Sequence, residues 1–208
     1  MKNQKVSKIQ ILQPQTDDLL LHDVLKNSYA KNKAKSMKGY NLDESLSNHN
    51  QQVYYNPTKK SLLYSITGSH NLYNLSDVGT DLYLAAGHLK DTNRYKQADK
   101  TLKQAKQKYG VNKAIIAAHS LGATLSGYVG NPDVDSIYTL DKGATIGQPV
   151  RKGEKAYRTS GDVVSLLNAN DPHMKNLINP NQETGRFIKD ALNAHNVSNV
   201  ANSNIHIV

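Results

Sequence analysis

The sequence predicts an α/β fold in which a mostly parallel central sheet carries helices on both faces. Strand-like and helix-like segments alternate along most of the 208 residues, and this alternation is typical of βαβ units. The length suffices for one sizeable hydrophobic core, so we expect a single domain over residues 1–208. Hydrophobic residues make up 38% of the chain and aromatic residues 6%, which indicates a folded protein with a lean core.

One helix and one hairpin are expected in the first third of the chain. Apolar side chains recur at near-helical spacing in DDLLLHDVLKNSYAK, residues 17–31, whereas the rest of the first fifty residues is polar and weakly periodic. Two β-rich runs follow in QQVYYNPTKKSLLYSITGS, separated by the turn signal Asn56-Pro57, and the second run ends at Gly68. We expect a hairpin that leads into a central strand.

The following segments alternate between helix and strand. In RYKQADKTLKQAKQKY, residues 94–109, apolar positions are three and four residues apart and Gly110 provides a stop, which predicts a helix. VNKAIIAA, residues 111–118, is a short apolar run that suits a strand buried on both faces. The remaining segments are a small-residue helix in 121–130, strands in 135–149 and 155–167, and a last helix in 183–195.

Ser120 stands at the predicted junction of the buried strand and the small-residue helix, in AHSLGA. A nucleophile elbow places a serine on such a turn and requires small residues two positions before and two positions after it. Ala118 and Gly122 meet this requirement. The alternative is that Ser120 is a helix N-cap, a common position for serine. The small residues on both sides and the adjoining His119 favour the nucleophile.

AHSLGA resembles the GHSLGG elbow of class 3 lipases, the fungal-lipase-like family of α/β-hydrolases, with Ala118 in place of the first glycine. LLYSITGSHNLYNLSDVGTDL resembles the family's strand that ends in Arg-Gly-Ser/Thr and leads to Trp-x-x-Asp-Leu. IYTLDKGATIGQP resembles its strand before a Gly-x-Pro turn, and YRTSGDVVSLL its strand that ends in Asp-x-Val. The resemblance covers about residues 53–198 and implies an α/β-hydrolase fold and a serine carboxyl-ester hydrolase: a lipase, phospholipase or esterase acting through an acyl-enzyme.

A serine nucleophile needs a base, and the base needs an acceptor that orients it. In α/β-hydrolases these partners follow in the order Ser, Asp, His. Asp162 ends a predicted strand, and the resemblance to the Asp-x-Val pattern makes it the expected acid. Asp141 and Asp171 are weaker candidates for this position.

Three histidines follow Asp162 in the chain. His195, in NAHNVSNV, resembles the H-x-x-x-N arrangement at the end of compact class 3 enzymes and is the expected base, whereas His173 and His206 are weaker candidates. His119 adjoins the serine, but adjacent strand residues point to opposite sides, so we expect it to support the elbow instead.

The oxyanion formed during acyl transfer needs two preorganised donors. One is expected to be the backbone N–H of Leu121, directly after the nucleophile. By resemblance the second is Ser69, with Thr67 in the place of the family's arginine and Gly68 allowing the backbone to turn. Asp81, which matches the family's Asp-Leu, is expected to hold the Ser69 hydroxyl. A Gly-Ser loop without a catalytic task is the competing interpretation.

Between Ser69 and Asp81 the family carries its lid over the acyl site. HNLYNLSDVGT keeps a few apolar residues and no tryptophan, so a phospholipid or a short soluble ester fits at least as well as a triglyceride. The chain has 26 Lys+Arg and 17 Asp+Glu, and its net charge of +9 fits transient contact with an anionic membrane surface. No nucleic-acid partner is expected, because no recognition motif or aromatic-interleaved basic patch is found.

No metal or cofactor is expected. The chain lacks cysteine, which excludes disulfides and thiolate ligands, and the histidines show neither H-x-x-x-H spacing nor a neighbouring carboxylate pair. The sequence also shows no signal-peptide h-region and no apolar run long enough for a membrane span, so we expect a soluble protein that is not exported by that route; its location, cytoplasmic or virion-associated among others, stays open.

Two other function classes remain open. The first is a catalytically silent hydrolase fold that serves as a binding or virion component, and the substitutions at Ala118 and Thr67 keep it under consideration. The second and less favoured is a basic nucleic-acid-binding protein, which the net charge alone suggests.

Overall fold

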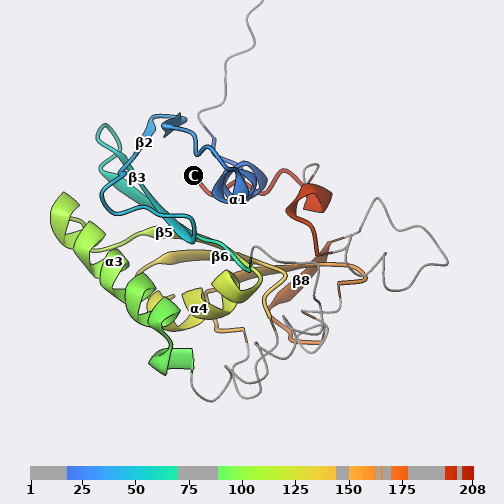
Figure 1. The fold of residues 1–208 in the computed structure, drawn as a ribbon. Coiled ribbons are helices and arrows are strands. Elements are labelled where there is room, and N and C mark those ends of the chain that lie inside the picture. Colours follow the sequence, from blue (N-terminus) through green and yellow to red (C-terminus); the bar gives the residue numbers. More distant parts are fainter. Residues whose placement is uncertain are drawn as a thin grey trace, which may run out of the picture.

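The computed structural model describes residues 18–69, 89–143, 150–162, 165, 170–177, 195–200 and 203–208. In this part of the chain eight strands form one sheet, and their order in space is their order in the sequence (Figure 1). The strands are β1 (Ser36–Met37), β2 (Tyr40–Leu42), β3 (Gln51–Asn56), β4 (Ser61–Ile66), β5 (Ile115–His119), β6 (Ser136–Leu140), β7 (Lys155–Thr159) and β8 (Met174–Leu177).

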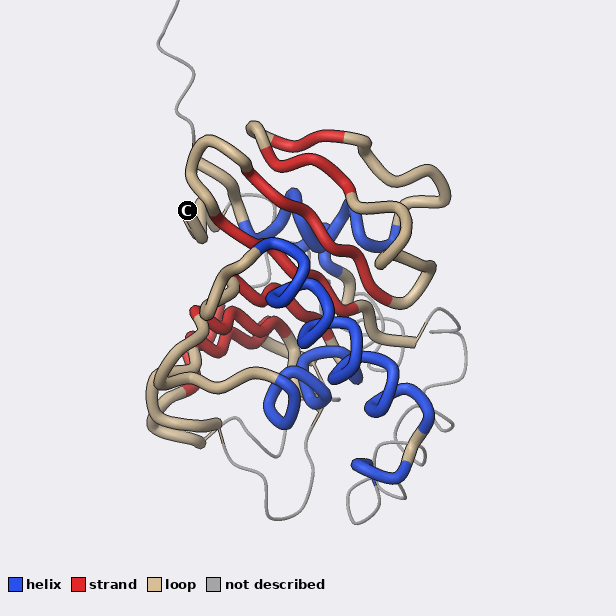
Figure 2. The backbone as a smooth tube through the Cα atoms, turned by 90° about the vertical axis from the view of Figure 1, so that its left-hand side faces the viewer, coloured by secondary structure: helices blue, strands red, loops and turns tan. Residues whose placement is uncertain are grey.

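The sheet is antiparallel from β1 to β4 and parallel from β4 to β8, which confirms the predicted mostly parallel sheet. β3 and β4 form the predicted hairpin around Asn56-Pro57, with Asn56 opposite Ser61. Because β4 to β8 run in the same direction, their carboxyl ends lie along one edge of the sheet. Figure 2 shows the strands from a second side. Ser120 and Asp141 directly follow two of these strands.

Helices cover both faces of the sheet, as predicted. α1 (Leu21–Tyr29) lies on one face, and α3 (Asn93–Tyr109) and α4 (Leu121–Val129) lie together on the other (Figure 1). The parallel strands advance across the sheet in one direction, so right-handed crossovers place α3 and α4 on the same face. Two short 3₁₀ helices, η1 (Leu89–Asp91) and η3 (Val197–Val200), complete the described helical elements.

Helix α3 lies close to its predicted range, and the residues at its two ends show why. Its N-cap Thr92 accepts a hydrogen bond from the Tyr95 N–H at 3.2 Å, and Gly110 ends it with a left-handed φ of 62°. The apolar positions Ala98, Leu102 and Ala105 are buried against the sheet and α4, whereas the lysine-rich face is exposed. The observed helix starts one residue before the predicted range of 94–109.

Successive strand residues pack into different cores. Leu63 and Ala117 join α1 in one cluster, whereas the neighbouring residues Tyr64 and Ile116 join the cluster beneath α3 and α4. This period-two alternation is what a sheet covered on both faces requires. Both clusters are built from side chains that are almost fully buried, so the lean composition still supplies two layers of core.

The N-terminal segment and the C-terminal tail are hydrogen-bonded to each other beside α1. Leu20 and His206 form an isolated antiparallel bridge, the Leu21 N–H donates to the Ile205 carbonyl at 2.9 Å, and the Ile207 N–H donates to the Leu19 carbonyl at 2.9 Å. This contact was not predicted, nor were β1, β2 and β8. The helix expected in 183–195 lies outside the described residues except for His195. No described helix has the length and apolar character needed to cross a bilayer.

Candidate active site

Ser120 occupies a sharp turn between β5 and α4. Its φ of 57° and ψ of −126° are rarely adopted by a residue with a side chain, and this strain is characteristic of a nucleophile elbow. Ser120 stands at the N-cap position, but its side chain makes no capping hydrogen bond. A role as helix cap therefore does not account for the hydroxyl, which has another partner.

Small residues allow α4 to begin directly against the end of β4. A Cβ at Gly122 would lie 2.3 Å from the Ile66 carbonyl oxygen and 2.5 Å from that of Thr67, so any larger residue would force the backbone apart. Ala118, two residues before the serine, is fully buried in the core beneath α3 and α4, and its methyl group is accommodated there. The spacing of small residues around Ser120 thus has a steric cause.

Three of the predicted side chains form one hydrogen-bonded chain. His195 Nε2 lies 2.8 Å from Ser120 Oγ, and His195 Nδ1 lies 2.8 Å from Asp162 Oδ1. The three residues are buried, with Ser120 and Asp162 at 0% exposure and His195 at 1%. The structure brings them together although 75 residues separate His195 from Ser120.

The electrostatic surroundings of these three hydrogen-bonded residues suit a base that is poised to accept a proton. Burial opposes ionisation of Asp162, but the hydrogen bond and charge of His195 outweigh it, so the pKa of Asp162 is lowered. Burial likewise opposes protonation of His195, but the bond to Asp162 and the carboxylate charges raise its pKa above the usual 6.5. An ionised Asp162 accepts the Nδ1–H of a neutral His195, which leaves Nε2 to accept the Ser120 hydroxyl proton.

A local network holds Asp162. Asp162 Oδ2 accepts hydrogen bonds from the Ser165 hydroxyl and, at 2.8 Å, from the Ser165 N–H. Arg158, at the end of β7, donates to the Asp162 carbonyl at 2.7 Å and to Ser165 Oγ at 3.2 Å. Sequence reasoning missed both residues. The serine three positions after Asp162 is the local signal that could have found one of them.

The loop after β4 lies directly against Ser120. A Cβ at Gly68 would come within 2.6 Å of Ser120 Cβ and 3.1 Å of Ser120 Oγ. Gly68 does not have a positive φ, so the expectation that its backbone freedom makes the turn was wrong. Glycine is needed here because the two backbones approach so closely.

The two expected oxyanion donors flank this contact. Leu121 is the first residue of α4, so its N–H has no acceptor within the helix and lies at the positive end of the helix dipole. Ser69 directly follows Gly68. Asp81, expected to hold the Ser69 hydroxyl, lies outside the described residues.

Arg94, in the first turn of α3, clamps the same loop from the other side. Its Nη2 donates to the carbonyl of Thr67 and, at 3.0 Å, to the carbonyl of Gly68. These bonds fix two successive carbonyls beside Ser69 and so restrict the loop. No local motif marks Arg94, and the sequence indicated only that it begins a helix.

Tyr29, at the end of α1, connects that helix to the site. Its hydroxyl oxygen accepts the Gly68 N–H at 2.6 Å and lies 2.8 Å from His119 Nδ1. Burial, followed by the nearby charge of His195, lowers the pKa of His119 well below its usual value, so the ring is neutral. The neutral ring carries one proton, so either the Tyr29 hydroxyl donates to His119 Nδ1 or, in the other tautomer, the Nδ1–H donates to the Tyr29 hydroxyl oxygen. Sequence analysis missed Tyr29, which was part of an ordinary amphipathic helix.

Asp141 lies behind the hydrogen-bonded chain, at the end of β6. Its carboxylate accepts the Thr159 N–H at 2.6 Å and the Thr159 hydroxyl at 3.0 Å, and its φ is 47°. Burial and the charge of Asp162 raise the pKa of Asp141 to about 7. Asp162, rather than Asp141, is hydrogen-bonded to His195 in the described structure.

Asp171, His173 and His206 lie in other environments. The Asp171 carboxylate accepts two backbone N–H groups, at 2.9 and 3.0 Å, and so stabilises a turn. His173 is exposed. His206 lies 3.2 Å from Asp18 at the surface. None of these three residues shares a hydrogen bond with Ser120 within the described ranges.

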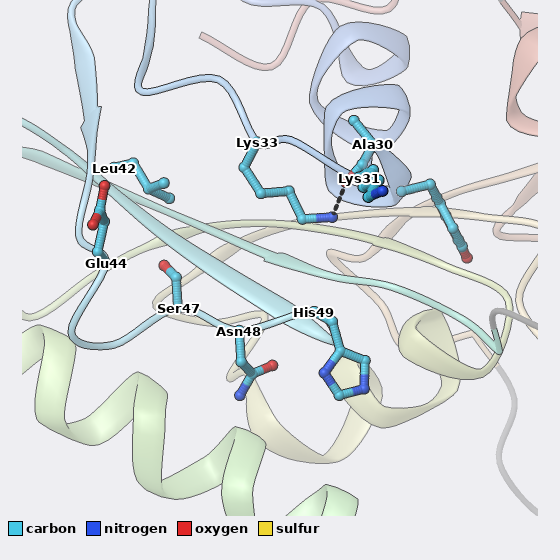
Figure 3. Close-up of a pocket in the computed structure, with 9 residues that line it drawn as sticks. Ala30, Lys31, Lys33, Leu42, Glu44, Ser47, Asn48 and His49 are labelled. Atoms are coloured by element: carbon cyan, nitrogen blue, oxygen red, sulfur yellow. Dashed lines mark hydrogen bonds between the residues drawn. The ribbon is translucent and has the colours of Figure 1, made fainter.

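An open pocket of about 430 Å³ lies between the end of α1 and the loop before β3 (Figure 3). Tyr29 forms one part of its wall, and Lys33 crosses it to donate to the carbonyls of Ser28 and Ala30 at 2.5 and 2.7 Å. Neither Ser120 nor His195 lines it. The pocket therefore lies beside Tyr29, which holds the Gly68 loop, and not beside Ser120 or His195.

No protein-family model matches the sequence, and a search of curated proteins finds no significant match. Among solved structures, the chain is similar to Lip2 lipase from Yarrowia lipolytica, with 16% identity, a TM-score of 0.49 and coverage of 76% of both chains. It is also similar to Rhizomucor miehei lipase in its propeptide complex, with 13% identity, a TM-score of 0.47 and coverage of 72% of this chain. The chain spans 61% of the length of that lipase.

Proposed function

We propose that the protein is a serine carboxyl-ester hydrolase that acts through an acyl-enzyme. The observation that carries the proposal is the hydrogen-bonded chain from Ser120 through His195 to Asp162, with the serine on a strained turn between strand and helix. A structural serine needs neither a buried histidine acceptor nor a positive φ. The positive φ is a cost that the fold carries at this position, and such costs cluster at active sites.

The first half of the reaction follows from these contacts. His195 Nε2 takes the proton of Ser120 as Oγ bonds to the ester carbonyl carbon, and Asp162 stabilises the resulting imidazolium. The N–H of Leu121 and the Ser69 donor stabilise the oxyanion of the tetrahedral intermediate. His195 then gives its proton to the departing alkoxide, which leaves as the alcohol and an acyl group on Ser120.

The second half uses water in place of the alcohol. His195 takes a proton from water as the water oxygen attacks the acyl carbon, and then returns a proton to Ser120 Oγ as the acid leaves. Arg94 and Tyr29 act through the loop that contains Gly68. We assign both as positioning residues, because they hold the carbonyls and the N–H of the loop that contains Gly68.

The substrate class is a phospholipid or a short soluble ester. In the described part of the chain, Val134 is a single exposed large hydrophobic side chain, with 44% exposure. This part therefore presents no apolar patch that could bind to the surface of an oil droplet. The net charge of +9 favours approach to an anionic surface, where ester substrates of membranes lie. We therefore propose transient contact with the lipid surface, without insertion into it.

A fluorophosphonate probe tests the proposal on the purified full chain. The probe phosphonylates an activated serine, so we expect one adduct on the peptide that contains Ser120 and none in Ser120→Ala. Ser126→Ala is the matched control, because Ser126 is also buried in α4 and its hydroxyl donates to the Ala123 carbonyl. His195→Ala should slow acyl transfer by roughly 10³-fold or more, since triad members act as a unit.

A catalytically silent hydrolase fold would give a different result. A folded wild type that takes no probe and hydrolyses no ester in a series of p-nitrophenyl esters and anionic phospholipid vesicles would overturn the enzyme proposal. A series in which only vesicles are hydrolysed would assign a phospholipid substrate.

A further inference from the structure

A second constellation of ligand-type groups lies behind the proposed catalytic chain. A ring nitrogen of His119, a carboxylate oxygen of Asp141 and a ring nitrogen of His195 all lie within 4.8 Å of one another. The three residues come from the end of β5, the end of β6 and the segment before η3. All three are buried, so the cluster is not an accident of exposed polar side chains.

His119 presents the group that calls for an explanation. Its Nε2 is buried, makes no hydrogen bond of good geometry among the described residues and lies 3.9 Å from Asp141 Oδ2, too far for a hydrogen bond, although the backbone of His195 lies close enough to the ring to raise its pKa slightly against the effect of burial. The other ring nitrogen is fixed by Tyr29 at 2.8 Å. Burial keeps His119 neutral by lowering its pKa. A buried nitrogen without a partner is rare, and this one faces a carboxylate.

We propose that His119, Asp141 and His195 form an inhibitory site for a divalent transition-metal ion of the zinc class. Two imidazoles and one carboxylate are a common ligand set for zinc, and the hard ions Mg²⁺ and Ca²⁺ prefer all-oxygen sets. Ligand atoms around tetrahedral zinc are about 3.3 Å apart, so the 3.9 Å gap between His119 and Asp141 closes with a small side-chain shift.

The surroundings of the cluster already orient two of the ligands. Tyr29 fixes the ring of His119, and Thr159 fixes the carboxylate of Asp141 through its N–H and hydroxyl. Such outer contacts hold the ligands of known metal sites. A neutral His119 binds a metal through the Nε2 lone pair with its single proton on Nδ1, where the N–H can donate to the Tyr29 hydroxyl oxygen, and any proton held by Asp141 is released to the solvent.

Metal binding at this cluster excludes the catalytic arrangement. His195 uses one ring nitrogen for Ser120 and the other for Asp162, so a metal that takes either nitrogen breaks one link of the chain. The inhibition therefore rests on the proposed function, whereas the binding site does not.

Binding is tested without activity, on the full-length Ser120→Ala chain. Titration with Co²⁺ should give visible absorption bands of a four- or five-coordinate site, and calorimetry with Zn²⁺ should give one site per chain. Asp141→Asn keeps the side-chain size but removes the anionic ligand, so we expect at least a tenfold weaker affinity. His173→Ala, at an exposed histidine outside the cluster, is the control and should change nothing. Binding that is absent, or that is lost in His173→Ala and kept in Asp141→Asn, would overturn the proposed site.

Inhibition is tested by fluorophosphonate labelling of the wild type with and without Zn²⁺. Zn²⁺ should slow labelling, a chelator should restore it, and Mg²⁺ should have no effect. Asp141→Asn, measured against its own metal-free rate, should need at least tenfold more Zn²⁺. Labelling that is insensitive to Zn²⁺ at saturating occupancy would overturn the inhibition. A folded wild type that binds Co²⁺ with cluster dependence but is never labelled would support the metal site and sink the hydrolase proposal.

Discussion

The hydroxyl of Tyr29 accepts the backbone N–H of Gly68 at 2.6 Å and thereby joins α1 to the loop that touches Ser120. α1 lies on the opposite face of the sheet from α3, which reaches the same loop through Arg94. Elements from both faces therefore converge on Gly68, and the position of the loop depends on the packing of the whole domain.

Tyr29→Phe is expected to destabilise the protein and slow acyl transfer. The variant leaves the Gly68 N–H and His119 Nδ1 without their partner, and one unsatisfied buried polar group costs about 1–3 kcal/mol in the free energy of unfolding. Urea unfolding and probe labelling measure the two effects. Tyr55→Phe is the control, because the half-buried Tyr55 stacks on Tyr109, and its change should stay within about 0.5 kcal/mol. Equal effects in both variants would argue against a special position for Tyr29.

Gly68→Ala should inactivate the protein more than it unfolds it. The new Cβ would lie 2.6 Å from Ser120 Cβ and 2.7 Å from Tyr29 Oη, so Ser120 or the loop must move. A displacement of about 1 Å at reacting groups lowers the rate by roughly 100-fold. Gly110→Ala, where the Cβ meets nothing within 4 Å but φ is +62°, should lose stability and keep the labelling rate per folded molecule. Full activity in Gly68→Ala would contradict the close approach.

Ser120→Gly is predicted to be more stable than Ser120→Ala. Both variants lose the bond to His195, but only glycine adopts a φ of 57° without strain. Positive φ costs an L-residue about 1–2 kcal/mol, and the extra freedom of glycine in the unfolded chain offsets part of the gain, so we expect a difference of about 1 kcal/mol. Thermal or urea unfolding of the two inactive variants checks it. A less stable glycine variant would mean that the elbow is unstrained.

The labelling rate should fall at acidic pH, with a midpoint above 6.5. His195 must be neutral to accept the Ser120 proton, and its raised pKa keeps it protonated to a higher pH than an ordinary histidine. Asp141, with a pKa of about 7, is partly ionised near this midpoint and its charge favours the imidazolium, so the midpoint should move to lower pH in Asp141→Asn. A pH series of labelling rates measures both midpoints. A midpoint that rises in Asp141→Asn would show that Asp141 does not act on His195 through its charge.

Stability should also respond to Asp141. Its pKa is raised to about 7, so the folded state holds a proton that the unfolded chain releases near pH 4. Unfolding is therefore favoured progressively as pH rises from about 4 to 7, and Asp141→Asn should flatten this part of the profile. Urea unfolding midpoints of the wild type and of Asp141→Asn are measured from pH 4 to 7. If Asp141 were ionised throughout, the two proteins would show the same dependence of the midpoint on pH.

Local sequence patterns predicted the elements that depend on neighbours in the chain. The spacing of Ala118 and Gly122 around Ser120, the apolar period of α3 and the turn at Asn56-Pro57 each reflect short-range sterics or burial. The strands that were missed lack such a signal. β1 and β2 have two and three residues, and β8 has the sequence MKNL without a clear alternation.

Contacts that depend on tertiary packing could not be predicted in the same way. Tyr29 and Arg94 read as ordinary helix residues, and only the fold places them on opposite sides of one loop. His119 and Asp141 come from the ends of adjacent strands, so their proximity to His195 follows from the order of strands in the sheet. Metal-ligand spacing within one helix, such as H-x-x-x-H, does not detect ligands of this kind.

Ser120 is synthesised before His195, and 75 residues separate the two. At ordinary translation rates the ribosome needs roughly 4–15 s to make that stretch. During this interval the nascent chain contains Ser120 but not His195, its proposed proton acceptor. His195 is made together with the C-terminal segment. Ile207 and Ile205 of that segment are hydrogen-bonded to Leu19 and Leu21, which are made early. Under the proposed function, hydrolysis is thereby withheld from incomplete chains and begins only when residues made late dock against residues made early.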